Sequence, residues 1–250
     1  MRKFFRLLFL ILQGAIAGVI IYEAIMLVRV WRLRSNNPSS TSLQDTRAKE
    51  AELRGQQPRR DKVWVPLDRI SVNLQRAVLA GEDTNFVSHR GFDYQAIQKA
   101  WDQAQREAAN EAKKEGEDDD WIPSLPEFRR GGSTISQQLA KNLYLSSQRS
   151  FFRKGQEAIL TFMLERLLTK RRILELYLNE IEWGDGVYGA EAASQYYFRK
   201  PAASLSYNEA AFLSAMIPNP RTVYNPRVNP KRVTRRQRII MRGMPYVKLP

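Results

Sequence analysis

An apolar run near the N-terminus is the sequence feature that most constrains what this chain can fold into. From Leu7 to Val28 every residue is apolar except Gln13 and Glu23, which matches the ~20 residues that a helix needs to cross a ~30 Å hydrocarbon layer. No small-x-small cleavage site follows this run, and Arg29 begins a basic flank instead. We therefore predict an uncleaved transmembrane anchor at 7–28 after a short N-terminus at 1–6. Three basic residues lie on each side of it, so the positive-inside rule leaves its orientation open.

Charge and residue usage narrow the classes of function. The chain of 250 residues carries a formal net charge of +14, which favours anionic partners such as nucleic acid, acidic lipid or phosphate-bearing substrates. It contains no cysteine, so disulfides, a thiolate nucleophile and Cys-based metal sites are excluded. His89 is the only histidine, which argues against a His-rich metal site and a Ser-His hydrolase.

Changes in composition divide the rest of the chain. Residues 29–60 are polar, and we predict a linker that buries too little apolar surface to become ordered. A folded domain is predicted at 61–226, with an acidic insertion at 107–128 that is typical of a solvated loop. The segment 227–250 is basic, and three interpretations stay open for it: a helix on an acidic membrane surface, a disordered tail or a nucleic-acid-binding arm.

The stretch from Glu82 to Asp93 contains two adjacent carboxylates, an aromatic residue and the histidine. A carboxylate held beside apolar side chains has its pKa raised by desolvation and can act as a general base near neutral pH. Glu82 is therefore a candidate base. The alternative is a helix C-terminus with a capping aspartate and a core Phe86. His89 is either a structural histidine or a proton shuttle.

The stretch from Gly131 to Asn142 predicts a glycine turn, a Ser/Thr helix start and a helix. Within it Thr134, Gln138 and Lys141 recur at i, i+4 and i+7, so their side chains share one helix face. A helix start with free backbone amides beside a hydroxyl, an amide and an ammonium group predicts an anion-binding cradle. An ordinary solvated helix face is the alternative.

A second helix that carries a carboxylate is predicted from Arg153 onward. Arg153 and Glu157 are at i, i+4, so they share a face and can pair, although a surface ion pair of this kind carries little information about function. Apolar residues recur with helical spacing through 159–181 and again up to Ile217, where Pro218 ends the pattern. The domain is therefore predicted to be mainly α.

Five groups of residues carry a resemblance to a known family. In chain order they are Glu82-Asp83-x-x-Phe86-x-x-His89-x-Gly91, Gly132-x-Thr134-Ile135-x-Gln137-Gln138-x-x-Lys141-Asn142, Arg153-Lys154-x-x-Glu157, Ile173-Leu174-Glu175-x-Tyr177-Leu178-Asn179 and Gly186-x-x-Gly189-x-x-x-Ala193-x-x-Tyr197-Phe198-x-Lys200. Together they resemble the signature motifs of the bacterial peptidoglycan glycosyltransferases, in the monofunctional form that has one anchor and no transpeptidase domain.

The resemblance implies a fold, a place and a substrate. The expected fold is a lysozyme-like helical glycosyltransferase domain with a smaller membrane-contacting jaw, preceded by one transmembrane helix. The expected place is the bacterial inner membrane, with a single-pass anchor, a cytoplasmic N-terminus and the catalytic domain in the periplasm. The expected reaction polymerises lipid II onto a growing glycan strand, with release of undecaprenyl diphosphate. Proteins of cell-wall synthesis are implied as partners and nucleic acid is not.

The resemblance also implies roles for single residues. Glu82 would be the general base and Glu157 a second catalytic carboxylate. The residues implied in binding the substrate and its diphosphate are Asp83, Phe86, His89, Thr134, Gln138, Lys141 and Arg153. Mg²⁺ or Mn²⁺ would suit a diphosphate leaving group, with Glu157 or Asp83 as its ligand, and no organic cofactor is implied.

Two departures from the family pattern and two other functions complete the expectations. The acidic insertion is longer than the family usually has, and Arg199 stands where a small residue is common. A lysozyme-like lytic enzyme would also use a glutamate in a helical domain, but it needs no diphosphate-binding cations. A membrane-tethered binder of anionic polymers would need no general base at all.

Overall fold

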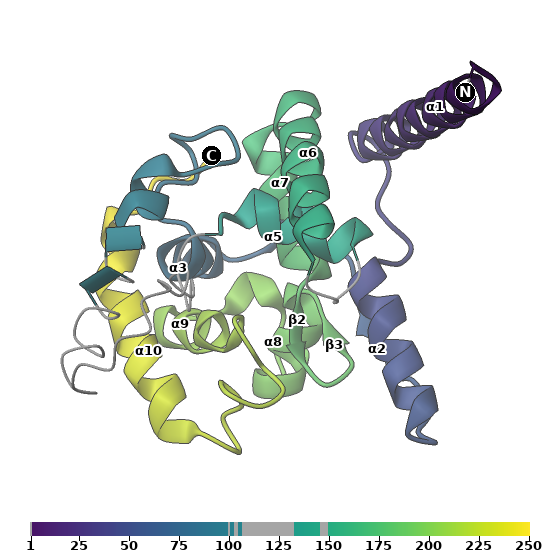
Figure 1. Ribbon diagram of the computed structural model, residues 1–250. Helices are drawn as coiled ribbons and strands as arrows, with labels where there is room; N and C mark the ends of the chain where they lie inside the picture. Colours follow the sequence, from purple (N-terminus) through teal and green to yellow (C-terminus); the bar gives the residue numbers. More distant parts are fainter. Residues whose placement is uncertain (1, 100, 103–104, 107–132, 146–149) are drawn as a thin grey trace, which may run out of the picture.

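Helices make up most of the chain, as the sequence predicts (Figure 1). A computed structural model describes residues 2–99, 101–102, 105–106, 133–145 and 150–250. The predicted acidic insertion at 107–128 and the two glycines at 131–132 lie outside the described residues. The labelled α-helices are α1 (Arg2–Arg32), α2 (Ser42–Leu53), α3 (Val72–Glu82), α5 (Ile135–Tyr144), α6 (Phe151–Leu167), α7 (Lys170–Glu180), α8 (Ala190–Phe198), α9 (Tyr207–Met216) and α10 (Pro230–Gly243).

Hydroxyl side chains begin most of these helices. In each case the Ser or Thr oxygen accepts a hydrogen bond from a backbone amide of the first turn, which would otherwise have no partner. The N-caps of this kind are Thr41 for α2, Ser71 for α3, Thr134 for α5, Ser150 for α6, Thr169 for α7 and Ser206 for α9. Thr134 and Ser206 are each part of a full capping box. The helix starts that frame the site are therefore set by local sequence.

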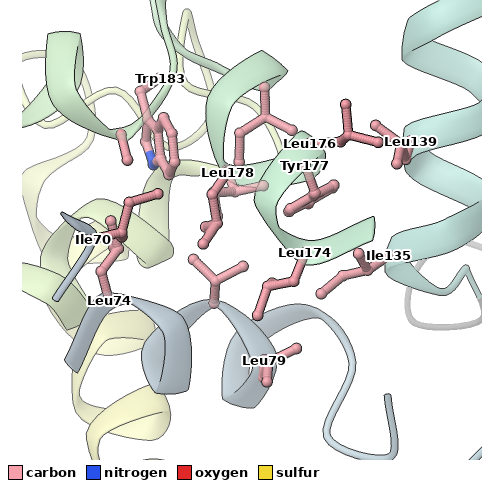
Figure 2. Packing of buried hydrophobic residues seen from close by; sticks show 14 of the residues in the cluster. Ile70, Leu74, Leu79, Ile135, Leu139, Leu174, Leu176, Tyr177, Leu178 and Trp183 are labelled. Atoms are coloured by element: carbon pink, nitrogen blue, oxygen red, sulfur yellow. The ribbon is translucent and has the colours of Figure 1, made fainter. Parts of the chain in front are cut away.

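The core lies where α3, α5 and α7 converge (Figure 2). Leu74 from α3, Leu139 from α5 and Leu174 from α7 are all fully buried, and burial of a leucine side chain contributes roughly 1.5–3 kcal/mol. Trp183 fills the other end of this core and donates its indole N–H to the Leu213 carbonyl at 3.1 Å. These contacts hold the helices that carry the site in fixed positions.

A small three-stranded sheet and short 3-10 turns complete the domain. The strands β1 (Asp61–Lys62), β2 (Glu182–Gly184) and β3 (Val187–Tyr188) lie in the order β1-β3-β2. The strand β3 pairs parallel with β1 and antiparallel with β2. The 3-10 turns are η1 (Leu67–Arg69), η2 (Ala202–Ser204) and η3 (Met244–Tyr246). The sheet packs one end of the domain and carries β2 to the wall of the pocket described below.

The N-terminal helix is long and apolar enough to cross a membrane, and among the described residues no other helix is. It runs past both ends of the predicted span at 7–28. Its C-terminal part packs against α6 (Figure 1), where the Gln156 side chain donates to Glu23 at 3.3 Å. The Arg29 guanidinium also lies 5.1 Å from the centre of the ring of Tyr144, the last residue of α5. The helix is therefore docked on the domain.

The segment 29–60 differs from the unordered linker that we predicted. It contains α2, which packs against α5. The Ser42 hydroxyl donates to the Leu145 carbonyl at 2.9 Å, and the Gln44 amide donates to the buried Glu180 carboxylate at 2.9 Å. Composition misled the prediction because polar contacts, and not apolar burial, hold this helix in place.

The basic C-terminal segment is an ordered helix, so the disordered tail among the three interpretations of 227–250 is wrong, while contact with a membrane surface or nucleic acid stays a prediction. The helix α10 packs against α9 and α3 and buries Val233 and Ile240, and η3 adds the buried Met244. Most of the basic side chains of α10 are exposed, whereas Arg236 is partly buried and faces the domain. A strongly charged composition therefore hides an amphipathic helix. The domain therefore extends beyond the predicted boundary at 226.

The position of Arg199 explains why a small residue is common there. Arg199 follows α8 with φ of 57°, in the left-handed region. This conformation is typical of the glycine that follows many helices, because a Cβ atom makes it unfavourable. Arg199 is exposed, so the long side chain itself meets no packing conflict.

Candidate active site

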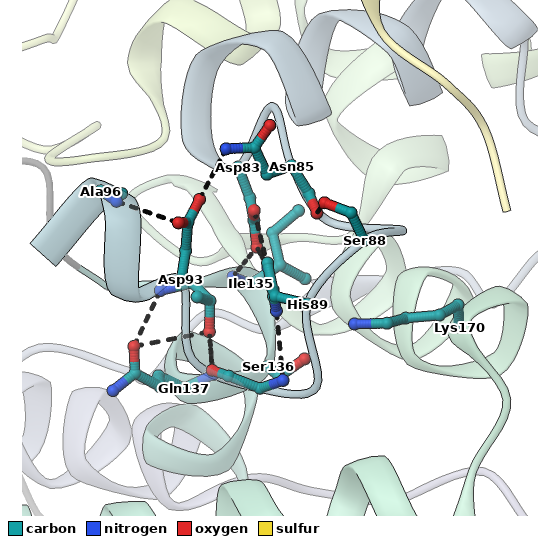
Figure 3. Close-up of polar contacts among 12 residues, drawn as sticks. Asp83, Asn85, Ser88, His89, Asp93, Ala96, Ile135, Ser136, Gln137 and Lys170 are labelled. Carbon is teal, nitrogen blue, oxygen red and sulfur yellow. Dashed lines mark hydrogen bonds and ion pairs between the residues drawn. The ribbon is translucent and has the colours of Figure 1, made fainter.

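The acidic loop after α3 is fastened to the start of α5 (Figure 3). The Asp83 carboxylate accepts a hydrogen bond from the Ile135 backbone amide at 3.0 Å and contacts Nε2 of His89 at 2.9 Å. Because the Gly91 amide donates to Nδ1 of His89 at 3.1 Å, the histidine proton belongs on Nε2, which donates to Asp83. Asp83 is thus the negative charge at the positive end of α5, and the anion cradle predicted there is filled by the protein itself.

Three predicted substrate-binding residues hold this loop, and none of them lines the larger of the two cavities described below, although Thr134 lines the smaller one. Thr134 is buried, and its hydroxyl donates to the Gly91 carbonyl at 2.7 Å while it caps α5. Phe86 is 1% exposed and lies beneath the Lys170 ammonium group, 4.4 Å from the centre of its ring. Both ring nitrogens of His89 are engaged by the loop itself. The spacing in the sequence does not distinguish a cap or a core residue from a ligand, which explains these three differences.

Glu82 is the last residue of α3, and protein groups hold both of its carboxylate oxygens. Oε1 accepts from the Arg236 guanidinium at 2.7 Å, and Oε2 accepts from the Gln138 amide nitrogen at 3.0 Å. The Tyr177 hydroxyl donates to the Gln138 amide oxygen at 2.8 Å, which fixes the orientation of that amide. The Glu82 side chain is only 8% exposed. The candidate base is therefore held in one defined position.

The charge state of Glu82 follows from this environment. Burial raises the pKa of the Glu82 carboxyl above its ordinary value. The charges of Arg236 and Lys141 and the hydrogen bonds from Arg236 and Gln138 oppose this rise in pKa. A carboxyl with a raised pKa is a stronger base when it is ionised, and this matches the role expected of a general base that works near neutral pH.

A cavity of about 440 Å³ lies between α5, α6, α2 and the segment after α9, and Glu82 is not among the residues that line it. Its cationic end carries Lys141, Arg153 and Lys154. The Glu157 carboxylate lies among them, with Arg153 at 3.1 Å and Lys154 in direct contact. Gln138 and Ser133 line the same cavity. Gln138 and Lys141, which line this cavity, therefore come from the middle and the last turn of α5, and not from its first turn.

Lys141 differs from its neighbours because it makes no ion pair with any residue that the structure describes. Although Lys141 as a whole is exposed in the open cavity, the surrounding walls remove part of the water around its ammonium group, which lowers the pKa of Lys141 below its ordinary value. Glu157 opposes this change in pKa, while the nearby positive charges of Arg153 and Lys154 add to it. An ammonium group without an ion-pair partner among the described residues should form a strong charge-assisted hydrogen bond with an incoming anion.

Two contacts join the candidate base to the cationic cavity. Gln138 lines the cavity and donates to Glu82. Ser133 lines both this cavity and a neighbouring cavity of about 180 Å³, which Glu82 and Asp83 line. Gln138 and Ser133 therefore lie between the Glu82 carboxylate and the cationic cavity.

Sequence reasoning missed three kinds of residue at the site. Arg236 comes from the segment that we placed outside the domain, although the spacing of Val233 and Ile240 indicates an amphipathic helix there. Tyr177 is part of the fourth motif, but we predicted no role for it at the site. The far wall of the cavity holds Arg47 from α2 at 3.2 Å from Glu182, together with Arg221, and no motif points to this cluster.

The carboxylates proposed to bind a divalent cation are already engaged. Glu157 pairs with Arg153 and Lys154, and Asp83 accepts from His89 and from a backbone amide. The described residues contain no cluster of three His, Asp or Glu side chains that would hold a metal. These donors therefore do not fit a resident Mg²⁺ or Mn²⁺ site, and a requirement for either ion stays a prediction.

Comparison with known proteins agrees with this arrangement. A family model described as Transglycosylase matches residues 49–116 and 122–245. Proteins named biosynthetic peptidoglycan transglycosylase align along almost their whole lengths. The one from Chromobacterium violaceum is 44% identical over 252 residues, which cover 98% of this chain and 99% of the relative. The one from Thiobacillus denitrificans is 45% identical over 254 residues, 100% of each, and the one from Bordetella pertussis is 41% identical over 250 residues, 99% of this chain and 96% of the relative.

A mainly helical domain with a buried, oriented glutamate beside a cluster of cations defines an enzyme that transfers glycosyl groups. The chain belongs to the transglycosylase family.

Proposed function

We propose that this enzyme polymerises lipid II into β-1,4-linked glycan strands and releases undecaprenyl diphosphate. The relatives named above are peptidoglycan transglycosylases by name, which supports this substrate class. The observation that carries the proposal is the double role of Gln138. It orients the Glu82 carboxylate and also lines the cavity that holds Lys141 and Arg153.

The reaction is a single displacement. The C4 hydroxyl oxygen of the acceptor sugar attacks the anomeric carbon of the donor, and Glu82 takes the hydroxyl proton as the new C–O bond forms. The bond from the anomeric carbon to the diphosphate oxygen breaks, and its electron pair leaves with the lipid diphosphate. Attack from the opposite face converts the α-linked diphosphate into a β linkage. Glu82 then returns its proton to water, so no covalent glycosyl-enzyme is needed.

The cationic end of the cavity stabilises the leaving group. A diphosphate needs no general acid, because neutralisation of its charge is enough for it to depart. Lys141, free of any ion pair among the described residues, supplies one charge, and Arg153 supplies a planar donor. Glu157 holds Arg153 and Lys154 in place and limits the positive charge of the empty pocket.

The membrane supplies the substrate. We propose that α1 crosses the inner membrane once, with its N-terminus in the cytoplasm and the catalytic domain in the periplasm. Phe151 and Phe152 begin α6 and are each 93% exposed, and they lie on the helix that α1 contacts. These side chains support a membrane-contacting surface beside the anchor. Proteins of cell-wall synthesis would meet the enzyme on this membrane.

The test uses the full-length protein in lipid vesicles with purified lipid II. We expect glycan chains to form, and the variant Glu82→Gln to lose turnover by roughly 10²- to 10⁴-fold while it still binds lipid II. Glu52→Gln, which alters an exposed glutamate of α2, is the matched control and should polymerise normally.

The same protein is also incubated with finished glycan strands. Release of muropeptides without chain growth would identify a lytic enzyme and contradict the proposal. Full activity of the Glu82→Gln variant would contradict the assignment of the general base.

A further inference from the structure

Arg236 is on α10, and its side chain extends to the C-terminal end of α3. Its Nη2 atom donates to the Gly81 carbonyl at 2.8 Å and to Oε1 of Glu82 at 2.7 Å. Gly81 is in the last turn of α3, where carbonyl oxygens lack helical partners and the helix dipole favours a positive charge. One nitrogen atom therefore ties the backbone of this turn to the carboxylate that follows it.

The packing of α10 fixes the position of this guanidinium group. Arg236 lies three residues after Val233 and four before Ile240, and both of these apolar residues are buried against the domain. The guanidinium lies over the Tyr224 ring, 5.5 Å from its centre, and the side chain is 24% exposed. Arg236 is thus aimed at Glu82 by the same docking that attaches α10 to α3.

The groups that face Glu82 from each neighbouring element give Arg236 a distinct role. From α5 come the Gln138 amide, which is neutral, and Lys141, which acts at longer range. From α7 comes Tyr177, whose hydroxyl donates to Gln138. The adjacent Asp83 carboxylate is turned to the start of α5. Within the part of the chain that the structure describes, Arg236 is the only cation in hydrogen-bond contact with Glu82.

A buried carboxylate that loses its only contacting cation tends to take up a proton. A protonated Glu82 cannot accept the proton of the acceptor hydroxyl. Each carboxylate oxygen has two lone pairs, and Arg236 and Gln138 use one on each oxygen. One lone pair on each oxygen therefore stays unused, and either can accept from the sugar hydroxyl while both contacts are kept.

We propose that Arg236 is a positioning residue for the general base, which holds Glu82 ionised and aimed at the acceptor hydroxyl. This inference rests on the proposed function, because it presumes that Glu82 is the base. It adds to the catalytic centre a residue from a helix that lies outside all five motifs.

The test compares full-length Arg236→Gln, Arg236→Lys and Arg238→Gln proteins with the unaltered protein. Arg238 is an exposed residue of the same helix, so its variant removes the same charge without the contact. Polymerisation of lipid II is measured as a function of pH, together with lipid II binding and thermal unfolding. We expect Arg236→Gln to lose roughly ten- to a hundredfold of its turnover at neutral pH, the size expected for one charged hydrogen bond.

The pH profile separates positioning from a structural role. With Arg236→Gln, the acid limb of the profile should move to higher pH, so that part of the lost activity returns in alkaline buffer. Arg236→Lys keeps the charge and should move the limb less, and Arg238→Gln should not move it. An acid limb that stays in place in a folded Arg236→Gln protein would overturn the proposal, whatever the loss of activity.

Two further measurements keep the outcome decisive. If the glutamine variant does not fold, Arg236→Met, which retains an unbranched apolar stem over Tyr224, repeats the test; unfolding of both would make Arg236 purely structural and overturn the proposal. The Glu82 carboxyl is also titrated directly, from the infrared difference between the unaltered and Glu82→Gln proteins, with and without Arg236→Gln. This titration needs no turnover, so failure of the inference is distinct from failure of the proposed reaction.

Discussion

The Ile135 backbone amide donates a 3.0 Å hydrogen bond to the carboxylate of Asp83, which is 52 residues earlier in the chain. This bond joins the loop that follows Glu82, the proposed general base, to the first turn of α5. Glu82 directly precedes Asp83, and Gln138 lies three residues after Ile135. One contact therefore sets the register between the base and the helix that carries its partners.

Replacement of Asp83 should cost stability as well as activity. Asp83→Ala removes the acceptor of the Ile135 amide and leaves His89 without its partner, so we expect a loss of about 2 kcal/mol or more in the free energy of unfolding. Urea unfolding measures it. Asp68→Ala is the matched control, because Asp68 is 84% exposed and its removal should change the free energy by less than about 0.5 kcal/mol. Equal effects of the two variants would contradict the capping role.

Turnover should fall as the medium becomes acidic. Glu82 acts as a base only when it is ionised, and burial raises its pKa, so activity should be lost as the pH falls through that raised pKa and should be full above it. A profile of the turnover rate against pH with saturating lipid II checks this. A rate that stays constant down to the ordinary pKa of a glutamate would contradict a buried base.

Loss of the Lys141 charge should harm catalysis and not folding. The pKa of Lys141 is lowered in the folded protein, so the charged ammonium costs stability at any pH below that lowered pKa, and the cost disappears above the ordinary pKa of lysine. Lys141→Met should therefore unfold no more easily, while its turnover falls by roughly 10²- to 10³-fold. Lys49→Met, on the exposed side of α2, is the control. A clear drop in the unfolding temperature would count against this description of Lys141.

Removal of the Glu157 charge should separate binding from turnover. Glu157→Gln leaves Arg153, Lys154 and Lys141 without a neutralising carboxylate, so the empty pocket should bind inorganic pyrophosphate several-fold more tightly. Arg153 and Lys154 also lose the group that orients them, so polymerisation should slow. Calorimetric titration with pyrophosphate and a lipid II assay measure the two effects. Weaker pyrophosphate binding would show that Glu157 supports the ligand in another way.

Alanine at position 91 should be poorly tolerated. Gly91 has φ of +94°, and a Cβ atom there would lie 2.8 Å from Cγ2 of the buried Thr161. We expect Gly91→Ala to lose more than about 1 kcal/mol in the free energy of unfolding. Gly55→Ala, at φ of +69° with open space around it, carries the backbone strain alone. The difference between their losses in the free energy of unfolding therefore measures the steric clash. Equal losses would mean that the Thr161 side chain moves to make room for the new Cβ atom.

Local patterns in the sequence predicted those parts of the site that lie on one helix. Gln138 and Lys141 are three residues apart on α5, and Arg153 and Glu157 are four apart on α6, so helical spacing alone brings each pair together. The same spacing led us to group Thr134 with this face, which was wrong. Helix periodicity describes residues inside a helix, whereas Thr134 is the N-cap and turns its hydroxyl to the loop.

Contacts between distant segments were beyond the reach of these patterns. Arg236 and Glu82 are 154 residues apart, and only the docking of α10 on α3 brings them together. The helix α2 was missed for a different reason. Its position depends on buried polar contacts such as that between Gln44 and Glu180. A polar composition alone predicts a solvated segment and cannot reveal such contacts.

The Arg172 guanidinium donates to the Leu33 carbonyl at 2.8 Å and to the Asn36 carbonyl at 3.0 Å, so the chain is gripped as soon as it leaves α1. In a bilayer, these hydrogen bonds would prevent the free movement between anchor and domain that a flexible stalk would allow. If α1 crosses the membrane as proposed, the cavity would keep one height and one tilt above the lipid surface, and lipid-linked sugars would approach it only by lateral movement along the leaflet. The domain would then keep a fixed orientation toward its substrate instead of reorienting freely above the membrane.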